Sequence, residues 1–162
     1  MGISPYLRDL RRHVGSAPLL MPGVAVLVLD EQERLLLVRN ADTLEWQTVG
    51  GAVDPGESPA EAAVREAREE TGLEVRLTRV IGVYGGPSFR LSYPNGDVCE
   101  YVSTAFEAVV TGGEARPDAE ETSEIGWFRR EAMEGLVMAP HTRLLAADAF
   151  ARDPATRFPD AR

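Results

Sequence analysis

Cysteine is nearly absent from this chain, because Cys99 is the only one among 162 residues. A single cysteine excludes an intrachain disulfide, which fits a reducing cytoplasm. We expect the Cys99 thiol to be buried in a β-strand. Long apolar runs are also missing. No stretch approaches the roughly 18 residues of a membrane-spanning helix, and the charged N-terminus does not resemble a signal peptide. We therefore expect a cytoplasmic protein with no membrane partner.

Basic residues are the minority charge, with 17 Lys and Arg against 26 Asp and Glu, for a net charge of −9. This balance argues against binding to nucleic-acid backbones, which requires a basic surface. It does not exclude small anionic substrates, because metal ions can bridge an acidic site to a phosphate. The length, with a hydrophobic fraction of 44%, predicts one globular domain over residues 1–162.

The most informative stretch is 51–73, GAVDPGESPAEAAVREAREETGL. Ser58 can cap a helix that starts at Pro59, and Glu61 stands three residues after the cap, which completes a capping box. Gly72 is a typical C-terminal stop, because glycine adopts the left-handed conformation without steric cost. The sequence therefore predicts a helix between Pro59 and Gly72.

Because successive residues of a helix are rotated by about 100°, the predicted helix places small side chains on one face and acids on the opposite face. Glu66, Glu69 and Glu70 fall together on the expected exposed face, where like charges cost a helix about 0.2–0.5 kcal/mol per pair. Arg65 can offset part of this repulsion, and a bound hard cation, Mg²⁺ or Mn²⁺, can offset more. Taken alone, a solvated charged face is the simpler interpretation. The opposite face, expected to pack on a sheet, comprises Ala60, Ala63, Val64, Ala67 and Thr71.

Eight spaced residues in this stretch resemble the signature of the Nudix hydrolase (MutT-like) family. Ala67 is smaller than the aliphatic residue usual in the family, and Val49 stands where many members have proline. The resemblance extends over roughly 23–128 and implies an α/β fold, the family's α/β/α sandwich with a mixed β-sheet. The matching residues are Gly51, Glu57, Arg65, Glu66, Glu69, Glu70, Gly72 and Leu73.

The resemblance implies that Glu66, Glu69 and Glu70 bind Mg²⁺ or Mn²⁺ beside the loop glycine, Gly51. It also implies that Arg65 orients these acids by ion pairing. The implied reaction is attack of water on a diphosphate linkage, with the metal neutralising phosphate oxygens and a carboxylate taking the proton. The implied substrate is a nucleoside diphosphate linked to another moiety: a nucleoside triphosphate, ADP-ribose or a sugar nucleotide. The alternative is a non-catalytic Nudix-like sensor, which would be expected to lose helix acids that this chain keeps.

A further acid is expected from the loop 118–124, because family members often supply one before the strand that ends here in Trp127 and Phe128. Glu121 is our choice for a fourth metal ligand or general base, and Glu120 is the second choice. An ordinary acidic surface loop is the alternative interpretation. Glu124 is expected to make a structural contact.

Substrate contacts outside the acidic helix are harder to assign. Aromatic rings can stack on a base, and arginines can hold a phosphate or a sugar edge. The backbone N–H groups of Gly50 and Gly51 can reach a phosphate or the metal shell. A core aromatic, a surface arginine and a tight turn are the respective alternatives. The side-chain candidates are Trp46, Tyr84, Phe89 and Tyr93 among aromatics, and Arg39 and Arg90 among arginines.

Apolar runs predict strands on both sides of the acidic helix. The runs 23–29 and 34–39 are expected to pair as a hairpin around a turn at 30–33. Turn-forming residues indicate a hairpin connection at 93–97 and a turn at 111–114. Further strands are expected at 46–49 and within 74–84, 98–110 and 125–128.

Two more helices are predicted, near the ends of the chain. The first, about 5–15, is amphipathic, with Arg8, Arg11 and Arg12 pointing outward. Its apolar side covers either the core or a second subunit, so a homodimer stays open. The last helix, 140–150, is expected to turn Leu144, Leu145 and Phe150 inward, and the tail 152–162 is expected to be loose.

Overall fold

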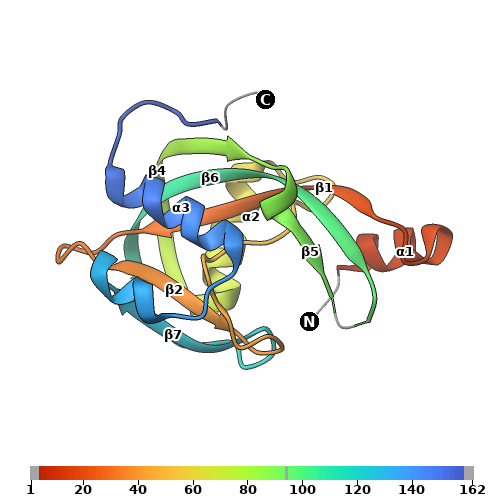
Figure 1. Ribbon diagram of the computed structural model, residues 1–162, viewed down its shortest axis with the longest axis horizontal. Helices are drawn as coiled ribbons and strands as arrows, with labels where there is room; N and C mark the ends of the chain where they lie inside the picture. Colours follow the sequence, from red (N-terminus) through yellow and green to blue (C-terminus); the bar gives the residue numbers. More distant parts are fainter. Residues whose placement is uncertain (1–3, 94, 159–162) are drawn as a thin grey trace.

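The computed structural model describes residues 4–93 and 95–158, and over these ranges two β-sheets pack with helices (Figure 1). None of the helices in this part of the chain is long and apolar enough to cross a membrane. Two short 3₁₀ helices cover Pro87–Phe89 and Arg130–Gly135. The main elements are α1 Pro5–Val14, β1 Leu19–Val28, β2 Leu35–Asn40, β3 Trp46–Gln47, α2 Pro59–Thr71, β4 Leu73–Tyr84, β5 Arg90–Ser92, β6 Val98–Gly113, β7 Thr122–Phe128 and α3 Pro140–Ala151.

The larger sheet is organised around β6, which pairs in parallel with β1 and antiparallel with β4 and β5. The smaller sheet is antiparallel, in the order β3-β2-β7. Figure 1 shows α2 and α3 on opposite sides of the larger sheet. The α/β fold, an α/β/α sandwich with a mixed β-sheet, is therefore confirmed.

The predicted hairpin between the first two strands is wrong. Only one isolated bridge, between Leu29 and Leu35, joins them, and β2 pairs instead with β3 and β7. The reason is that both edges of β1 are already occupied. One edge pairs with β6, and the other is bridged at Gly23 and Val26 by the segment 49–52.

The expected turn at 111–114 is also displaced. Residues 111–113 continue β6, and Gly113 pairs with Leu73 at the start of β4. The chain then leaves the sheet at Glu114. Strand β4 therefore pairs with β6 along almost its whole length. Strand β4 follows the acidic helix directly. The connection expected at 93–97 joins β5 to β6, with the N–H of Tyr93 donating to the Asp97 carbonyl and the N–H of Gly96 donating to the Tyr93 carbonyl; Pro94 lies outside the described residues.

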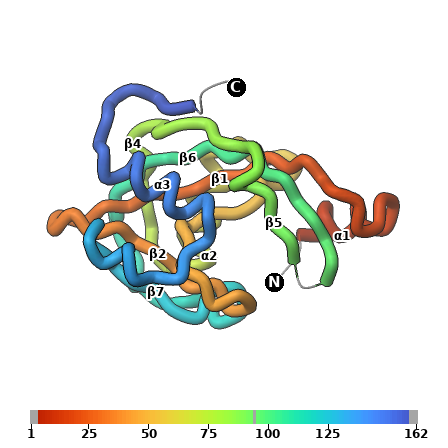
Figure 2. The backbone as a smooth tube through the Cα atoms, in the orientation of Figure 1, coloured from red at the N-terminus to blue at the C-terminus, as the bar shows by residue number. Residues whose placement is uncertain are grey.

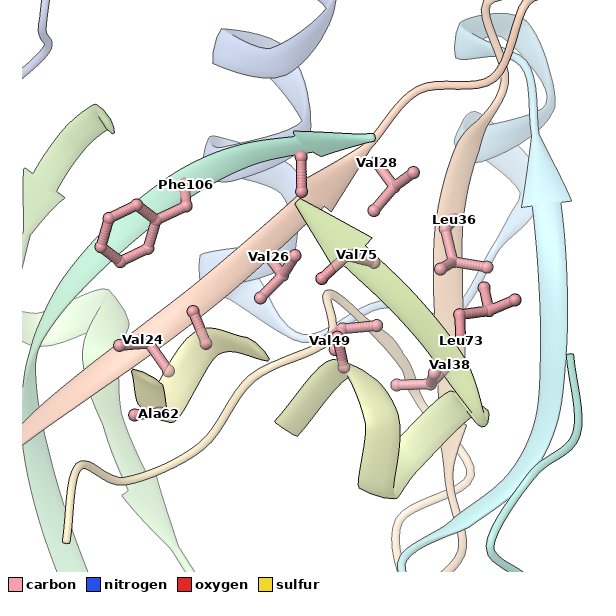
Figure 3. Close-up of a cluster of buried hydrophobic side chains, with 13 residues drawn as sticks. Val24, Val26, Val28, Leu36, Val38, Val49, Ala62, Leu73, Val75 and Phe106 are labelled. Atoms are coloured by element: carbon pink, nitrogen blue, oxygen red, sulfur yellow. The ribbon is translucent and has the colours of Figure 1, made fainter. Parts of the chain in front are cut away.

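The core is divided by the larger sheet into two clusters of buried side chains. Val24 and Val26 of β1 point to one cluster, with α2, while Ala25 and Leu27 point to the other, with α3. Figure 3 shows the first cluster, in which β1, β2, β4 and β6 all face the segment around Val49. Because both faces of β1 are buried, its sequence is a nearly continuous apolar run.

Helix α2 packs on a face rotated from the one that we predicted. The buried residues are Ala62, Ala63, Ala67, Glu70 and Thr71. Ala60 is exposed, and Val64 is 40% exposed. Small alanines let the helix approach the sheet closely, and this approach carries Glu70 into the protein interior.

The end helices also differ from expectation. Helix α1 projects at one end of the molecule and buries no residue fully (Figure 2). Its Arg11 is not outward, because its side chain contacts the backbone oxygen of Val98 at 2.9 Å. In α3, Leu145 is buried but Leu144 is exposed.

The tail that was expected to be loose is partly held by β4. Arg157 forms a bridge with Gly82, and its N–H donates to the Ile81 carbonyl at 2.6 Å. Residues 159–162, the rest of that prediction, lie outside the described part of the chain.

Candidate active site

The acidic helix begins and ends at the residues that the sequence predicts. Ser58 Oγ accepts the N–H of Glu61 at 3.3 Å, and the Glu61 carboxylate accepts the N–H of Ser58 at 2.8 Å. Gly72 ends the helix with φ at 70°. Because both ends are capped, the helix presents its acids in a fixed order along its length.

Arg65 connects four oxygen-bearing groups. Its guanidinium makes a bidentate pair with Glu57, at 2.7 and 3.1 Å. It also contacts Glu66 at 2.8 Å, Glu69 at 3.0 Å and the carbonyl of Ala52 at 3.0 Å. The hydrogen bond from Arg65 holds the pKa of Glu57 below its ordinary value. Arg65 thus ties the helix to the preceding loop and contacts two of its acids.

Glu70 is 3% exposed, although the sequence places it on the exposed face. Its carboxylate accepts the backbone N–H of Gly50 at 3.0 Å. Burial raises the pKa of Glu70 well above its ordinary value, and the neighbouring charge of Glu66 raises it further. The N–H of Gly50, which we considered for a substrate phosphate, is therefore engaged by an acid of the helix.

Gly51 lies directly against Glu66. A Cβ at this position would overlap the Glu66 carboxylate, so any larger residue would have to displace that carboxylate from its place beside the loop. Burial raises the pKa of Glu66 to about 7, even though the ion pair with Arg65 opposes the shift. The glycine loop and the helix acids therefore form one site, in which two carboxylates are held where ionisation is unfavourable without a cation.

The loop before β7 reaches the same site. The carboxylate of Asp118 accepts the N–H groups of Glu120, Glu121 and Thr122 at 3.0, 3.0 and 2.8 Å, which fixes the loop. After burial and the charge of Glu66, the charges of Glu121 and Asp118 also raise the pKa of Glu70. Glu121 therefore lies within electrostatic reach of the buried Glu70. Asp118 was missed, although an Asp that begins such a turn is a recognisable signal.

The donor set fits a hard divalent cation. The candidate ligand side chains here, Glu66, Glu69, Glu70 and Glu121, are all carboxylates, which suit Mg²⁺ or Mn²⁺, and a bound cation would offset the charges of Glu66 and Glu70. Within residues 4–93 and 95–158, no three His, Cys, Asp or Glu side chains converge tightly enough to hold a metal as they stand. The chemistry of the site therefore fits the metal.

The arginine candidates for substrate contacts are engaged in ion pairs. Arg39 pairs with Glu124 at 2.7 Å, which gives Glu124 the structural contact expected of it. Arg90 pairs with Glu100 at 3.1 Å across the β5–β6 hairpin. Both pairs are partly exposed, so they do not prevent a substrate from competing for the guanidinium groups.

The aromatic candidates separate into two groups. The Tyr84 ring is buried and stacked 5.9 Å from Phe89, and its hydroxyl donates to Asp148 at 2.8 Å. This packing leaves no ring face of Tyr84 for a base, so Tyr84 is a core residue. Trp46 is half-buried and meets Phe128 edge-on at 4.7 Å.

Comparison with known proteins identifies the family. A NUDIX domain model matches residues 19–149. The chain is 42% identical over 105 residues to a putative 8-oxo-dGTP diphosphatase of Bacillus subtilis (strain 168), an alignment covering 65% of this chain and 64% of that protein. It is 32% identical over 113 residues to a MutT-like protein of Streptomyces ambofaciens, covering 70% of this chain and 66% of that protein. The chain thus spans just under two thirds of these relatives.

Solved structures agree on the fold. An ADP-ribose pyrophosphatase from Streptococcus suis superposes with a TM-score of 0.69 at 24% identity, covering 86% of this chain and 98% of that chain. At this identity the likeness concerns the fold alone. The family model, however, matches most of the chain and contains every acid of the site. The chain therefore belongs to the Nudix hydrolase family.

Proposed function

We propose that this protein is a Mg²⁺- or Mn²⁺-dependent pyrophosphohydrolase that cleaves the diphosphate linkage of a nucleoside diphosphate joined to another group. A nucleoside triphosphate is the first candidate substrate, followed by ADP-ribose and sugar nucleotides. The observation that carries the proposal is the placement of the buried Glu70 against Gly50 and of the largely buried Glu66 against Gly51. The name of the Bacillus subtilis relative favours the triphosphate, and oxidised dGTP in particular.

The metal would be held by Glu66, Glu69 and Glu70 beside Gly51, and of the two roles expected for Glu121, fourth ligand or general base, we assign it the second. When bound, it would neutralise phosphate oxygens and make a water molecule more acidic. The protein's own groups have separate tasks. Arg65 fixes the direction of Glu66 and Glu69 through its hydrogen bonds, and these contacts do not depend on substrate.

A proton must leave the attacking water, and two carboxylates can accept it. Glu121 stands on a loop whose backbone is held by Asp118, and its charge acts on the buried Glu70. Glu66 has a pKa of about 7, which suits a base near neutral pH. We assign the proton to Glu121, because Glu66 is expected to bind the metal.

The test is phosphate or pyrophosphate release with Mg²⁺ across a panel of nucleoside triphosphates, 8-oxo-dGTP, ADP-ribose and sugar nucleotides. Glu70→Gln keeps the shape of the side chain and removes its charge. We expect a loss of turnover of about a hundredfold or more, since even the outer partners of metal ligands are worth about 10- to 100-fold. Glu31→Gln, in the exposed turn after β1, is the matched control and should keep full activity.

A clear substrate that Glu70→Gln does not hydrolyse would support the proposal. Turnover equal to that of the wild-type protein in Glu70→Gln would refute the site. If Mn²⁺ binds but no member of the panel is cleaved, the non-catalytic sensor becomes the better interpretation. A cytoplasmic location belongs to the proposal, because nucleoside triphosphates are intracellular metabolites. Homodimer formation stays a prediction.

A further inference from the structure

The start of β6 brings an aromatic ring to the glycine loop. Tyr101 of β6 pairs with Met21 of β1, next to Gly23. A Cβ on Gly23 would lie 2.9 Å from the Tyr101 ring and 3.4 Å from the carbonyl oxygen of Gly51. The absence of a side chain at Gly23 therefore lets the Tyr101 ring lie beside the loop that contacts Glu66.

The Tyr101 hydroxyl has a second tyrosine hydroxyl beside it. It lies 3.1 Å from the hydroxyl of Tyr93, at the end of the β5–β6 hairpin. Burial raises the pKa of both tyrosines, and for Tyr93 the charge of Glu121 contributes. Both hydroxyls therefore stay protonated above the ordinary range, and Glu121 lies within electrostatic reach of Tyr93. One hydroxyl hydrogen is used between the rings, and the Tyr101 hydroxyl also contacts the Cys99 thiol, so a substrate oxygen would compete with that weak acceptor for the second hydrogen.

Helix α1 holds this hairpin through one side chain. The guanidinium of Arg11 donates to the carbonyl of Val98 at 2.9 Å and to Cys99 Sγ at 3.3 Å, and it pairs with Asp97 at 3.4 Å. It also binds the Ala17 carbonyl at 2.6 Å, after the helix end. Figure 2 shows α1 beside this turn. Helix α1 buries no residue fully, and this tie joins it to the β5–β6 hairpin.

We propose that Tyr101 and Tyr93 form a wall of the substrate site beside the acids, where a tyrosine hydroxyl donates to a sugar or phosphate oxygen, and that Arg11 positions this wall. The proposal rests on the proposed function for the identity of the substrate. Tyr101 is the binding residue, and Arg11 acts only through the hairpin. The wall contacts the substrate before and during the reaction, so its loss should raise KM more than it lowers kcat.

Three variants and a control test this wall. Tyr101→Phe removes only the hydroxyl, and Arg11→Ala removes the tie from α1. Arg11→Lys should restore binding partly, because an ammonium can pair with Asp97 but cannot reproduce the guanidinium fork. Arg12→Ala, at the exposed neighbouring position, is the control.

Binding is measured first, so that the result does not depend on turnover. Calorimetric titration with an α,β-imido analogue of dGTP and Mg²⁺ should show Kd about five- to tenfold weaker in Tyr101→Phe and Arg11→Ala, the size expected for one hydrogen bond. Arg12→Ala should bind like the wild-type protein. For the best substrate of the panel, KM should rise by a similar factor with kcat nearly unchanged.

The outcomes separate the two proposals. Unchanged Kd and KM in both Tyr101→Phe and Arg11→Ala overturn the wall, even in a fully active enzyme. An analogue that binds tightly and weakens in these variants, in a protein without turnover, keeps the wall and rejects the hydrolase. If circular dichroism shows that Arg11→Ala is unfolded, Tyr101→Phe decides alone, because it removes a single atom from a half-buried ring.

Discussion

Replacing Glu66 with Gln should stabilise the protein at pH 8 when divalent cations are removed, while it weakens metal binding. Glu66 is largely buried, with a side chain 12% exposed. Burial raises its pKa in the folded state to about 7, from an ordinary value of 4.5. The folded state therefore holds a proton that the unfolded chain has already released at intermediate pH.

The sign and the size of the effect follow from this difference. Between about pH 4.5 and 7 the folded protein binds more protons than the unfolded chain at this site, so its stability falls as the pH rises through this window. The difference between the two pKa values lowers the free energy of unfolding by roughly 3 kcal/mol above pH 7, at about 1.4 kcal/mol per pKa unit. A neutral Gln removes this penalty. The free energy of unfolding of Glu66→Gln should thus exceed that of the wild-type protein by up to about 3 kcal/mol above pH 7.

The assay is urea unfolding of both proteins in EDTA at pH 5 and pH 8. Glu69→Gln is the matched control on the same helix, since it removes one carboxylate charge from a side chain that is 59% exposed. Adding Mg²⁺ should stabilise the wild-type protein by mass action and stabilise Glu66→Gln much less. If Glu66→Gln in EDTA is no more stable than the wild-type protein at pH 8, the burial argument for this site fails.

Three other substitutions test separate parts of the structure. Gly51→Ala places a methyl group against the Glu66 carboxylate, so turnover should fall at least about tenfold with an unchanged circular dichroism spectrum; full activity would mean that the loop can move away. Tyr84→Phe removes the hydrogen bond to Asp148 and should cost about 1 kcal/mol in urea unfolding with no change in KM, whereas a raised KM would place Tyr84 in the substrate site. Gly72→Ala forces a left-handed residue with a side chain and should cost about 1–2 kcal/mol by the same unfolding measurement.

The parts of the site that depend on neighbouring residues could be predicted from the sequence. The capping box of Ser58 and Glu61 and the left-handed Gly72 need only local backbone chemistry, so the helix was found with its correct limits. The loop before β7 was also expected to approach the helix, but only through the resemblance. Its Asp118, which fixes the loop, was not noticed.

Features set by distant contacts could not be predicted in this way. Glu70 shares a helix face with other acids, and no local pattern distinguishes the acid that enters the interior beside Gly50. The hairpin between β1 and β2 was plausible because the turn between them is real. The partner of β1 is instead β6, whose residues begin far along the chain.

The parallel pairing of β1 with β6 has a consequence for the order of folding. Partners such as Leu19 and Cys99 are separated by most of the domain, so closing this loop carries an entropic cost that local contacts do not repay. Helix α2 carries its own caps and can form early. Its acids nevertheless become a site only when β1 holds the glycine loop through Val24 and Val26. In refolding from urea, the far-UV helix signal should therefore precede the capacity to bind Mn²⁺, so the chain passes through a helical state that cannot yet bind metal.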